Sequence, residues 1–208
     1  ENCQTQRKQA MTLDITLYEY TSSRSKLVHW MLQELELEFR SVSGIEVLHS
    51  EELLAVHPLG KVPAVVINGE PLFESAAICT HLADLVPEKG LIAPAGTRER
   101  ALHLQWMSFS LSELEAYVWS NARNTFVLPK DQRITALFEQ NNNAYRHAAK
   151  VLDTALSDNE YLVANRFSVT DILVGFTLNW GQAVGLLDES PNLVDYVERL
   201  KKRPHCTL

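Results

Sequence analysis

The stretch "KVPAVVINGEPLFES", residues 61–75, decides the fold of the first part of the chain. Within it, an Asn-Gly pair at 68–69 separates two apolar runs, at 64–67 and 71–73. Asn-Gly between apolar runs predicts a β-hairpin with a type I′ turn, because both central residues of that turn need a positive φ. A helix is expected directly after the hairpin, over residues 75–85.

Upstream of the hairpin, strand and helix patterns alternate. The apolar run at 13–18 is typical of a strand, and apolar side chains recur at helical spacing over 26–37. A second strand is expected over 39–42. The order strand, helix, strand, hairpin, helix predicts an α/β domain over residues 11–88, with a mixed sheet and helices packed on it.

The second part of the chain carries helix patterns only. A segment rich in Pro and Gly, residues 87–97, is typical of a linker. Beyond it, one long helix is expected over 98–122 and one or two more over 130–156. These patterns predict an all-helical domain over residues 97–208.

A last helix start is marked by a capping box. Ser168 can cap the helix, and Asp171, three residues later, can bond back to the cap. Phe167 and Ile172 stand where a hydrophobic staple would place them.

Composition excludes several classes of protein. The chain of 208 residues is 46% hydrophobic with a net charge of −7, which disfavours a nucleic-acid partner. No apolar run reaches the roughly 18 residues that span a bilayer, so no membrane partner is expected. Three widely spaced cysteines fit the reducing cytoplasm, and the seven histidines show no metal-ligand spacing, so no metal is expected.

The first ten residues, 1–10, are polar and lack periodicity. They are expected to form a disordered tail, or one foreign to the natural protein, with Met11 as the natural start.

A cluster of hydroxyl residues, "YTSSRS" at 20–25, lies between the first strand and the first helix. Ser and Thr are preferred helix N-caps, so capping is the plainer interpretation. The alternative is chemistry: a helix N-terminus favours an anion, and a hydroxyl adds a further donor. The residues alone leave both interpretations open.

Three segments are similar to the cytosolic glutathione transferases: "HPLGKVPAVVINGEPLFESAAI" (57–78), "FSVTDI" (167–172) and "YVERLKKRP" (196–204). The resemblance covers residues 12 to 205. It implies a thioredoxin-like first domain that binds glutathione as co-substrate and a helical domain that carries a pocket for a small electrophile. It also implies a homodimer.

The resemblance gives the hydroxyl cluster a role. Serine-type members of the family direct a hydroxyl at the glutathione sulfur, and a donor to the thiolate lowers the pKa of the thiol. Counting back from Val28 makes Ser22 the catalytic hydroxyl. Counting forward from Tyr18 leaves Ser23 or Thr21 as alternatives. The zeta class has an "SSxS" motif like the one at 22–25.

The same resemblance assigns residues to the γ-glutamyl end of glutathione. Glu74 would meet the α-ammonium group. Ser75 and the N–H groups of the helix that it starts would meet the α-carboxylate. Without the resemblance, Ser75 is a good N-cap and Glu74 suits the helix dipole.

The rest of glutathione is assigned to the segment before the hairpin. Pro63 would be cis in the family, although most X-Pro bonds are trans. Val62 would offer its backbone to the cysteinyl part, as an added strand does. Lys61 would meet the glycyl carboxylate, with His49 as a possible second contact; a solvated lysine and a bystander histidine are the alternatives.

Two residues depart from the family pattern, and the electrophile pocket is only weakly specified. His57 stands where Asn is usual, and Asn165 where Gly is common. Asn tolerates a left-handed φ, whereas the histidine is expected to alter the turn. Tyr117, Asn121 and Arg123 are candidates for lining the pocket.

Four activities compete. The first is a transferase that adds the glutathione thiolate to a small hydrophobic electrophile. A zeta-like isomerase is the second, disfavoured because Arg24 replaces the cysteine frequent in that motif. A thiol reductase would need a cysteine at the first helix, whereas Cys79 lies elsewhere. The fourth is a non-catalytic docking module, which the retained hydroxyls and Glu74-Ser75 disfavour.

Overall fold

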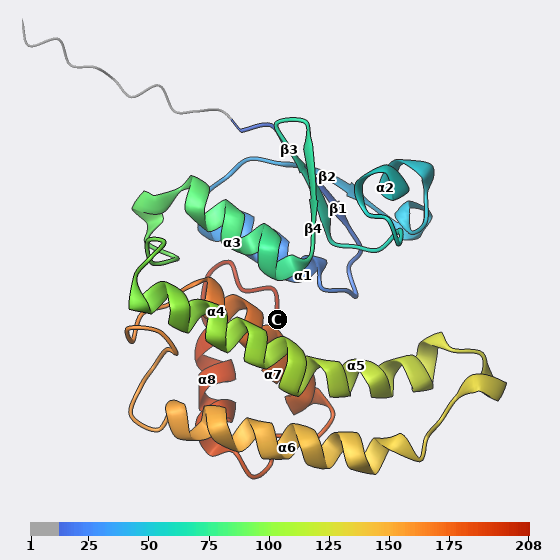
Figure 1. Cartoon of the computed structure of the whole chain (residues 1–208), viewed down its shortest axis with the longest axis vertical. Helices are drawn as coiled ribbons and strands as arrows, with labels where there is room; N and C mark the ends of the chain where they lie inside the picture. Colours follow the sequence, from blue (N-terminus) through green and yellow to red (C-terminus); the bar gives the residue numbers. More distant parts are fainter. Residues whose placement is uncertain (1–12) are drawn as a thin grey trace, which may run out of the picture.

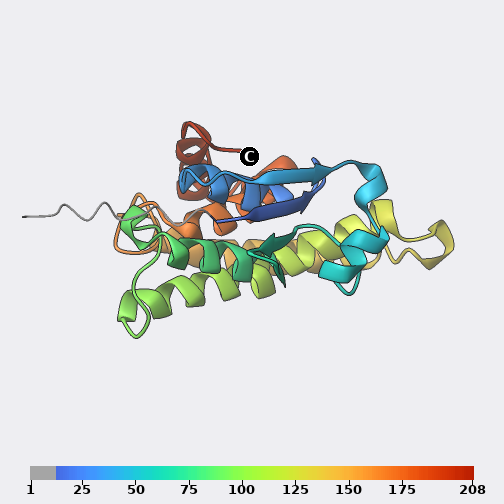
Figure 2. The ribbon, with the colours of Figure 1, turned by 90° about the horizontal axis from the view of Figure 1, so that it is seen from above.

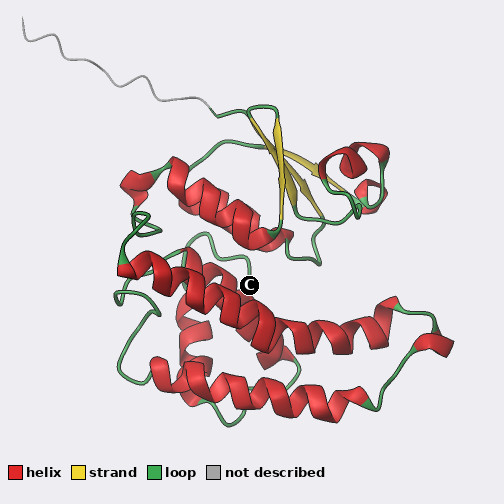
Figure 3. Ribbon diagram, viewed as in Figure 1, coloured by secondary structure: helices red, strands yellow, loops and turns green. Residues whose placement is uncertain are grey.

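The computed structural model describes residues 13–208. The predicted tail at 1–10 and the start at Met11 lie outside these residues. A sheet with helices packed on it is followed by a unit made only of helices (Figure 3), which confirms the predicted fold class. No helix in residues 13–208 is long and apolar enough to cross a bilayer.

The sheet has the strand order β2-β1-β3-β4. Strand β1 (Ile15–Glu19) pairs in parallel with β2 (Arg40–Ser43) and antiparallel with β3 (Ala64–Ile67), which pairs antiparallel with β4 (Glu70–Phe73). Helix α1 (Ser25–Glu34) makes the crossover that parallel pairing of β1 and β2 requires. The sheet is therefore mixed, as the order of the patterns predicts.

The hairpin turn forms at the Asn-Gly pair. Asn68 has φ 51° and Gly69 has φ 87°, so both central residues adopt the positive φ that the type I′ turn demands. Helix α3 (Ser75–Leu85) follows over the expected residues, and a 3₁₀ turn (Pro87–Lys89) leads into the connection to the helical unit.

Helices α1 and α3 lie on one side of the sheet and α2 (Glu51–Val56) lies on the other (Figure 1), and the side chains that alternate along β1 belong to two cores. Ile15 and Leu17 are buried in the larger core, which includes side chains of α1 and α3. Tyr18 packs in a smaller cluster with Leu53 and Val56 of α2, which follows a 3₁₀ turn (Ile45–Val47). The sequence patterns did not predict α2, because six residues are too few to show a helical period.

The helical unit begins with one continuous rod rather than a simple α-helix. Helix α4 (Arg98–Ser110) passes through a π-helical segment (Leu111–Glu115) into α5 (Ala116–Ala122), and a second π segment (Arg123–Val127) ends the rod. The predicted helix over 98–122 is therefore present. Figure 2 shows the connection beyond α5, including a 3₁₀ turn (Lys130–Gln132), extending past the end of the sheet.

Helix α7 (Val169–Ala183) is the centre of the helical unit. It is buried along most of its length and packs against α4, α8 (Pro191–Lys201) and the first-domain helices α1 and α3. Helix α6 (Leu137–Ala155) packs against α5 and α8. One hydrophobic core therefore runs through both units.

The predicted capping box is present at the start of α7. Asp171 accepts hydrogen bonds from the backbone N–H of Ser168 at 2.8 Å and from its hydroxyl at 2.7 Å. Two further donors, the Tyr196 hydroxyl at 2.7 Å and the Leu162 N–H at 3.3 Å, bond the other carboxylate oxygen. Burial nevertheless raises the pKa of Asp171 to about 6.

Candidate active site

Three segments meet at one edge of the sheet because of its register. Tyr18 of β1 pairs with Ala64 of β3, which pairs with Phe73 of β4. The loop after β1, the residues before β3 and the residues after β4 therefore all emerge at the same edge. These are the three segments that the resemblance to the glutathione transferases assigns to glutathione.

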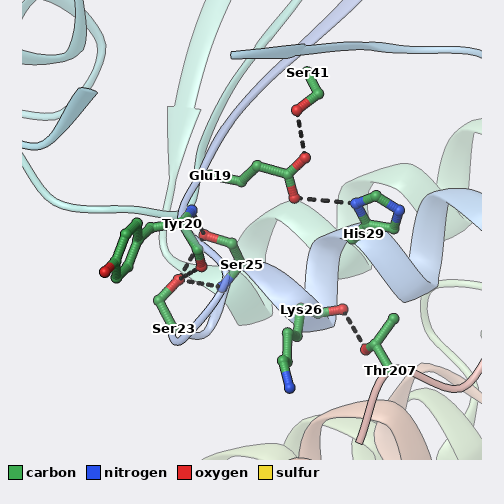
Figure 4. Close-up of polar contacts among 8 residues, drawn as sticks. All are labelled: Glu19, Tyr20, Ser23, Ser25, Lys26, His29, Ser41 and Thr207. Carbon is green, nitrogen blue, oxygen red and sulfur yellow. Dashed lines mark hydrogen bonds and ion pairs between the residues drawn. The ribbon is translucent and has the colours of Figure 1, made fainter. Parts of the chain in front are cut away.

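Two serines of the hydroxyl cluster hold the loop together (Figure 4). The Ser23 hydroxyl donates to the Tyr20 carbonyl at 2.6 Å and shares a hydrogen bond of 2.8 Å with Ser25 Oγ. Ser25 is buried, and its Oγ accepts from the Tyr20 N–H at 3.2 Å. Its own N–H donates to Ser23 Oγ at 3.1 Å. Both side chains are thus occupied in shaping the loop.

Thr21 and Ser22, the two remaining Ser and Thr residues of the cluster, form no side-chain hydrogen bond within residues 13–208. Both are exposed. The N–H groups of Lys26 and Leu27, in the first turn of α1, already bond to the carbonyls of Ser23 and Arg24. The Thr21 and Ser22 hydroxyls are therefore available as donors, as is the Tyr20 hydroxyl, and Ser22 stays the predicted catalytic residue.

Glu74 adopts an unusual backbone conformation. Its φ of 73° is left-handed, a region that side-chain-bearing residues populate only at a cost of about 1 kcal/mol or more. Its side chain is exposed, while Ser75 is buried as the first residue of α3. Strain of this kind is found at binding sites, so it agrees with the predicted role of Glu74.

The segment before β3 has the geometry that the resemblance implies. The Val62-Pro63 bond is cis. Lys61 is exposed and forms no ion pair with any residue in the described part of the chain. The His49 N–H donates to the Gly60 carbonyl at 3.3 Å, which places the histidine beside Lys61. The backbone of His49 thus lies against the residue before Lys61, and the role of both residues at the glycyl end of glutathione stays a prediction.

The two departures from the family pattern are accommodated. His57 is buried; its Nδ1 accepts the Leu59 N–H at 3.1 Å, and its ring packs 4.6 Å from that of Phe73. The imidazole thus holds the turn before Lys61 as an Asn side chain would. Asn165 has φ 50°, the left-handed conformation that made it a mild replacement for Gly.

The electrophile candidates lie along α5 and the π-helical segment that follows it. Asn121 bonds through its amide to Asn142 at 2.9 Å and Asn141 at 2.8 Å, so it joins α5 to α6. Tyr117, one turn earlier on the same helix face, is half-buried against the core, and Arg123 is exposed. Tyr117, Asn121 and Arg123 stay predicted pocket residues.

Another face of the same rod meets the hydroxyl loop. Glu115 accepts a hydrogen bond from Arg24 Nε, and the Arg24 guanidinium carbon lies 4.8 Å from the centre of the Trp119 ring. The sequence analysis missed this contact. The only feature of the sequence that points to this contact is the four-residue spacing of Glu115 and Trp119, which puts both side chains on one face of a helix.

No group of three or more metal-ligating side chains occurs within residues 13–208. Cys79 is fully buried in α3, and this burial raises the pKa of its thiol. Cys206 is half-buried after α8. Neither thiol lies in the loop that starts α1.

Comparison with known proteins agrees with this geometry. Residues 17–90 match the glutathione S-transferase N-terminal domain, and residues 114–204 match the C-terminal domain of the same family. The chain is 29% identical over 201 residues to the disulfide-bond oxidoreductase YfcG of Escherichia coli K12, covering 91% of each chain. It is 27% identical over 158 residues to the glutathione S-transferase GstA of Escherichia coli O157:H7, covering 75% of each.

Among solved structures, a sphingomonad glutathione S-transferase complexed with glutathione superposes with a TM-score of 0.80 at 27% identity. The match covers 92% of this chain and 94% of that one. Two domain matches of one family, relatives along most of the chain and the same fold lead to one conclusion: the chain belongs to the cytosolic glutathione S-transferase family.

Proposed function

We propose that this protein binds glutathione at the sheet edge, stabilises its thiolate with the Ser22 hydroxyl, and adds the sulfur to a small hydrophobic electrophile. The observation that carries the proposal is the division of labour in the loop. Ser23 and Ser25 are tied up in hydrogen bonds, whereas the exposed Ser22 hydroxyl is free at the edge where the cis proline and Glu74 emerge. The sphingomonad relative was solved with glutathione bound, which supports the choice of thiol.

Each charged group of glutathione has a partner that stabilises its charge. The Glu74 carboxylate takes the α-ammonium, and Ser75 with the start of α3 takes the α-carboxylate. The backbone of Val62, turned by cis Pro63, pairs with the cysteinyl part. Lys61, with His49 beside it, takes the glycyl carboxylate.

The chemical step then follows from charge. The thiol proton leaves to solvent, and the Ser22 O–H donates a hydrogen bond to the sulfur anion. The sulfur lone pair forms the new S–C bond while the electrophile releases its leaving group, or while a π bond opens and its carbon or oxygen takes a proton. The helical domain supplies the surface against which the electrophile lies.

A second candidate is disulfide reduction, favoured by the likeness to YfcG over 91% of the chain. The same thiolate would attack a disulfide sulfur, form a mixed disulfide and release the other sulfur as a thiolate; a second glutathione would then resolve the mixed disulfide. The reductase disfavoured in the sequence analysis uses a protein cysteine, whereas here a second glutathione takes its place, which suits a chain whose Cys79 is buried. Assays with an aryl halide and with a glutathione mixed disulfide separate the two activities.

We also propose that the protein is a cytoplasmic homodimer. An open, mostly apolar hollow of about 300 Å³, between β4 and α3, includes Pro71, Leu72, Ala77 and His81 in its lining. Such a surface suits contact with a second copy. Light scattering during gel filtration would give a mass twice that of the chain; a monomer would contradict the proposal.

The decisive experiment is a pH titration of the ultraviolet thiolate band of glutathione bound to the protein, with Ser22→Ala beside the wild type. The wild type is expected to show thiolate well below the free thiol's pKa of about 8.5, and the variant to shift back toward it. A lowered pKa that ignores the substitution would transfer the role to Thr21 or Ser23. No bound thiolate in the wild type would leave the docking module as the better interpretation.

A further inference from the structure

The hydroxyl loop is joined to the helical domain by an ion pair. Arg24, the residue before α1, donates from Nε to Oε1 of Glu115. The Glu115 side chain is only 7% exposed, and it sits in the π-helical segment between α4 and α5. Arg24 directly follows Ser23 in the chain, so the ion pair attaches the end of the hydroxyl loop to the helical domain.

A second hydrogen bond fixes the Glu115 carboxylate on the side of the helical domain. Its second oxygen, Oε2, accepts from the Thr177 hydroxyl at 3.0 Å. Thr177 is fully buried in α7, and its carbonyl accepts from the Tyr145 hydroxyl of α6 at 3.2 Å. Both carboxylate oxygens are thus engaged, and three helices of the second domain set the place of the carboxylate.

The guanidinium is also held by aromatic rings. Its central carbon lies 4.8 Å from the centre of the Trp119 ring and 6.0 Å from that of Trp180. The centres of these two indole rings lie 6.5 Å apart, in an edge-to-face arrangement. A cation over an aromatic face is attracted by the ring's quadrupole, so Arg24 is positioned by a charge and by a surface at once.

Without Glu115, the positive charge of Arg24 would be unfavourable at this position. A cation just before a helix N-terminus meets the positive end of the helix dipole. It would also add a positive field at the loop where Ser22 meets the sulfur. Glu115 offsets that charge at direct contact, so the pair is close to neutral as a unit.

We propose that Glu115 is a positioning residue of the glutathione site: it acts through Arg24, whose guanidinium it holds against Trp119 and whose charge it balances beside the hydroxyl loop. The helical domain thereby sets both the place of the loop and the electric field at the glutathione sulfur. This inference rests on the proposed binding of glutathione at the sheet edge.

The test is the thiolate titration repeated with Glu115→Gln, Arg24→Met and the double variant Arg24→Met/Glu115→Gln. Glu115→Gln leaves the arginine charge unbalanced, so the titration midpoint of bound glutathione is expected to fall by about one unit. Arg24→Met leaves an unbalanced carboxylate, so the midpoint is expected to rise by about one unit. The double variant removes both charges and should return the midpoint close to the wild-type value.

A matched control lies at the other end of the same helix. Arg203 donates to Glu34 from Nε at 2.9 Å and from Nη2 at 2.8 Å, which joins the end of α1 to the residues after α8. Glu34→Gln also breaks a buried pair between an arginine and a glutamate, so it tests the general loss of packing and stability. Its titration midpoint is expected to match the wild type.

The outcomes separate the two proposals. If the wild type shows no bound thiolate, the proposed function fails. If the wild type shows it but the Glu115→Gln midpoint does not move, or moves no more than that of Glu34→Gln, the role of Glu115 is refuted. Should Glu115→Gln fail to fold, Arg24→Met decides alone, because an unchanged midpoint there contradicts the electrostatic link.

Discussion

Ser23 Oγ lies 2.8 Å from Ser25 Oγ, and this contact closes the loop between β1 and α1 from within. The same two oxygens bond to both backbone groups of Tyr20. The N-cap of α1 is Arg24, which makes no side-chain cap hydrogen bond, so the two serines shape the loop rather than cap the helix through the N-cap position. Ser22 is outside this pair, and its role in activation stays a prediction.

The first prediction separates these roles. Ser22→Ala is expected to lower kcat by roughly 10- to 100-fold, because it removes one donor to the anion that forms in the reaction. Its thermal stability should stay close to wild type, since the exposed side chain bonds to no other residue within 13–208. Steady-state kinetics and thermal unfolding measure the two quantities.

Ser23→Ala is the control for that variant. It removes the donor to the Tyr20 carbonyl, so it is expected to destabilise the fold by about 1 kcal/mol. A loss of kcat as large as that of Ser22→Ala, without loss of stability, would identify Ser23 as the activating residue instead.

The second prediction concerns Glu74. Glu74→Gln is expected to raise KM for glutathione about tenfold or more, because the amide cannot form a charge-assisted bond to the α-ammonium. Glu74→Gly should raise KM as much and also stabilise the fold by up to about 1 kcal/mol, because glycine adopts φ 73° without strain. A glycine variant that is both more stable and a weaker binder would show that the strain serves the site.

Glu70→Gln is the matched control for Glu74. Glu70 is an exposed glutamate on β4, but it starts that strand, whereas Glu74 follows its end. KM for glutathione should therefore not change. Equal effects at the two positions would indicate a general loss of negative charge and would contradict a specific contact.

Local patterns predicted what depends on neighbours in the chain. The Asn-Gly turn, the helix at 75–85 and the capping box at Ser168 each need only a few consecutive residues, and all three are present. The contact of Arg24 with Glu115 could not be predicted in this way. It joins residues 91 positions apart, and nothing in the sequence near either residue specifies the other.

The same distinction applies to the predicted electrophile residues, whose role stays a prediction. Helical periodicity predicts which side chains share a face with Asn121. It does not predict which element that face contacts, and in the structure this element is α6. Trp119, two residues earlier, faces the hydroxyl loop instead. Which face of a helix meets the site depends on how the two domains pack, and that is set by long-range contacts of α7 with α1 and α3.

The third prediction concerns Asp171. Burial raises its pKa to about 6 from 3.8, so between these values the native state holds a proton that the unfolded chain has released. The free energy of unfolding therefore contains a contribution that falls by up to about 3 kcal/mol as the pH rises through this window. Asp171→Asn should remove that fall. Urea unfolding between pH 4 and pH 7.5 measures it, and parallel curves for variant and wild type would refute the prediction.

Tyr196→Phe provides the control for Asp171. The Tyr196 hydroxyl donates to the carboxylate at 2.7 Å and stabilises its charged form. Its loss should raise the pKa of Asp171 further and extend the fall in stability to higher pH. It should also destabilise the fold by about 1 to 3 kcal/mol at neutral pH, because a buried acceptor loses a donor.

The last prediction concerns His103, which titrates in the same window with the opposite sign. His103 is buried with its Nδ1 2.8 Å from the Thr170 hydroxyl, and burial lowers its pKa to about 4. Between pH 6.5 and 4 the unfolded chain therefore binds a proton that the native state does not. The resulting contribution to stability is lost, by up to about 3 kcal/mol, as the pH falls through that range.

In the wild type the opposing contributions of His103 and Asp171 partly cancel, so stability should change little between pH 4 and 6. In His103→Gln the free energy of unfolding should fall as the pH rises, because only the contribution of Asp171 remains. In Asp171→Asn it should fall as the pH decreases, because only the contribution of His103 remains. In the double variant it should not change across this range. Equal slopes in the two single variants would show that other groups govern the acid stability of the fold.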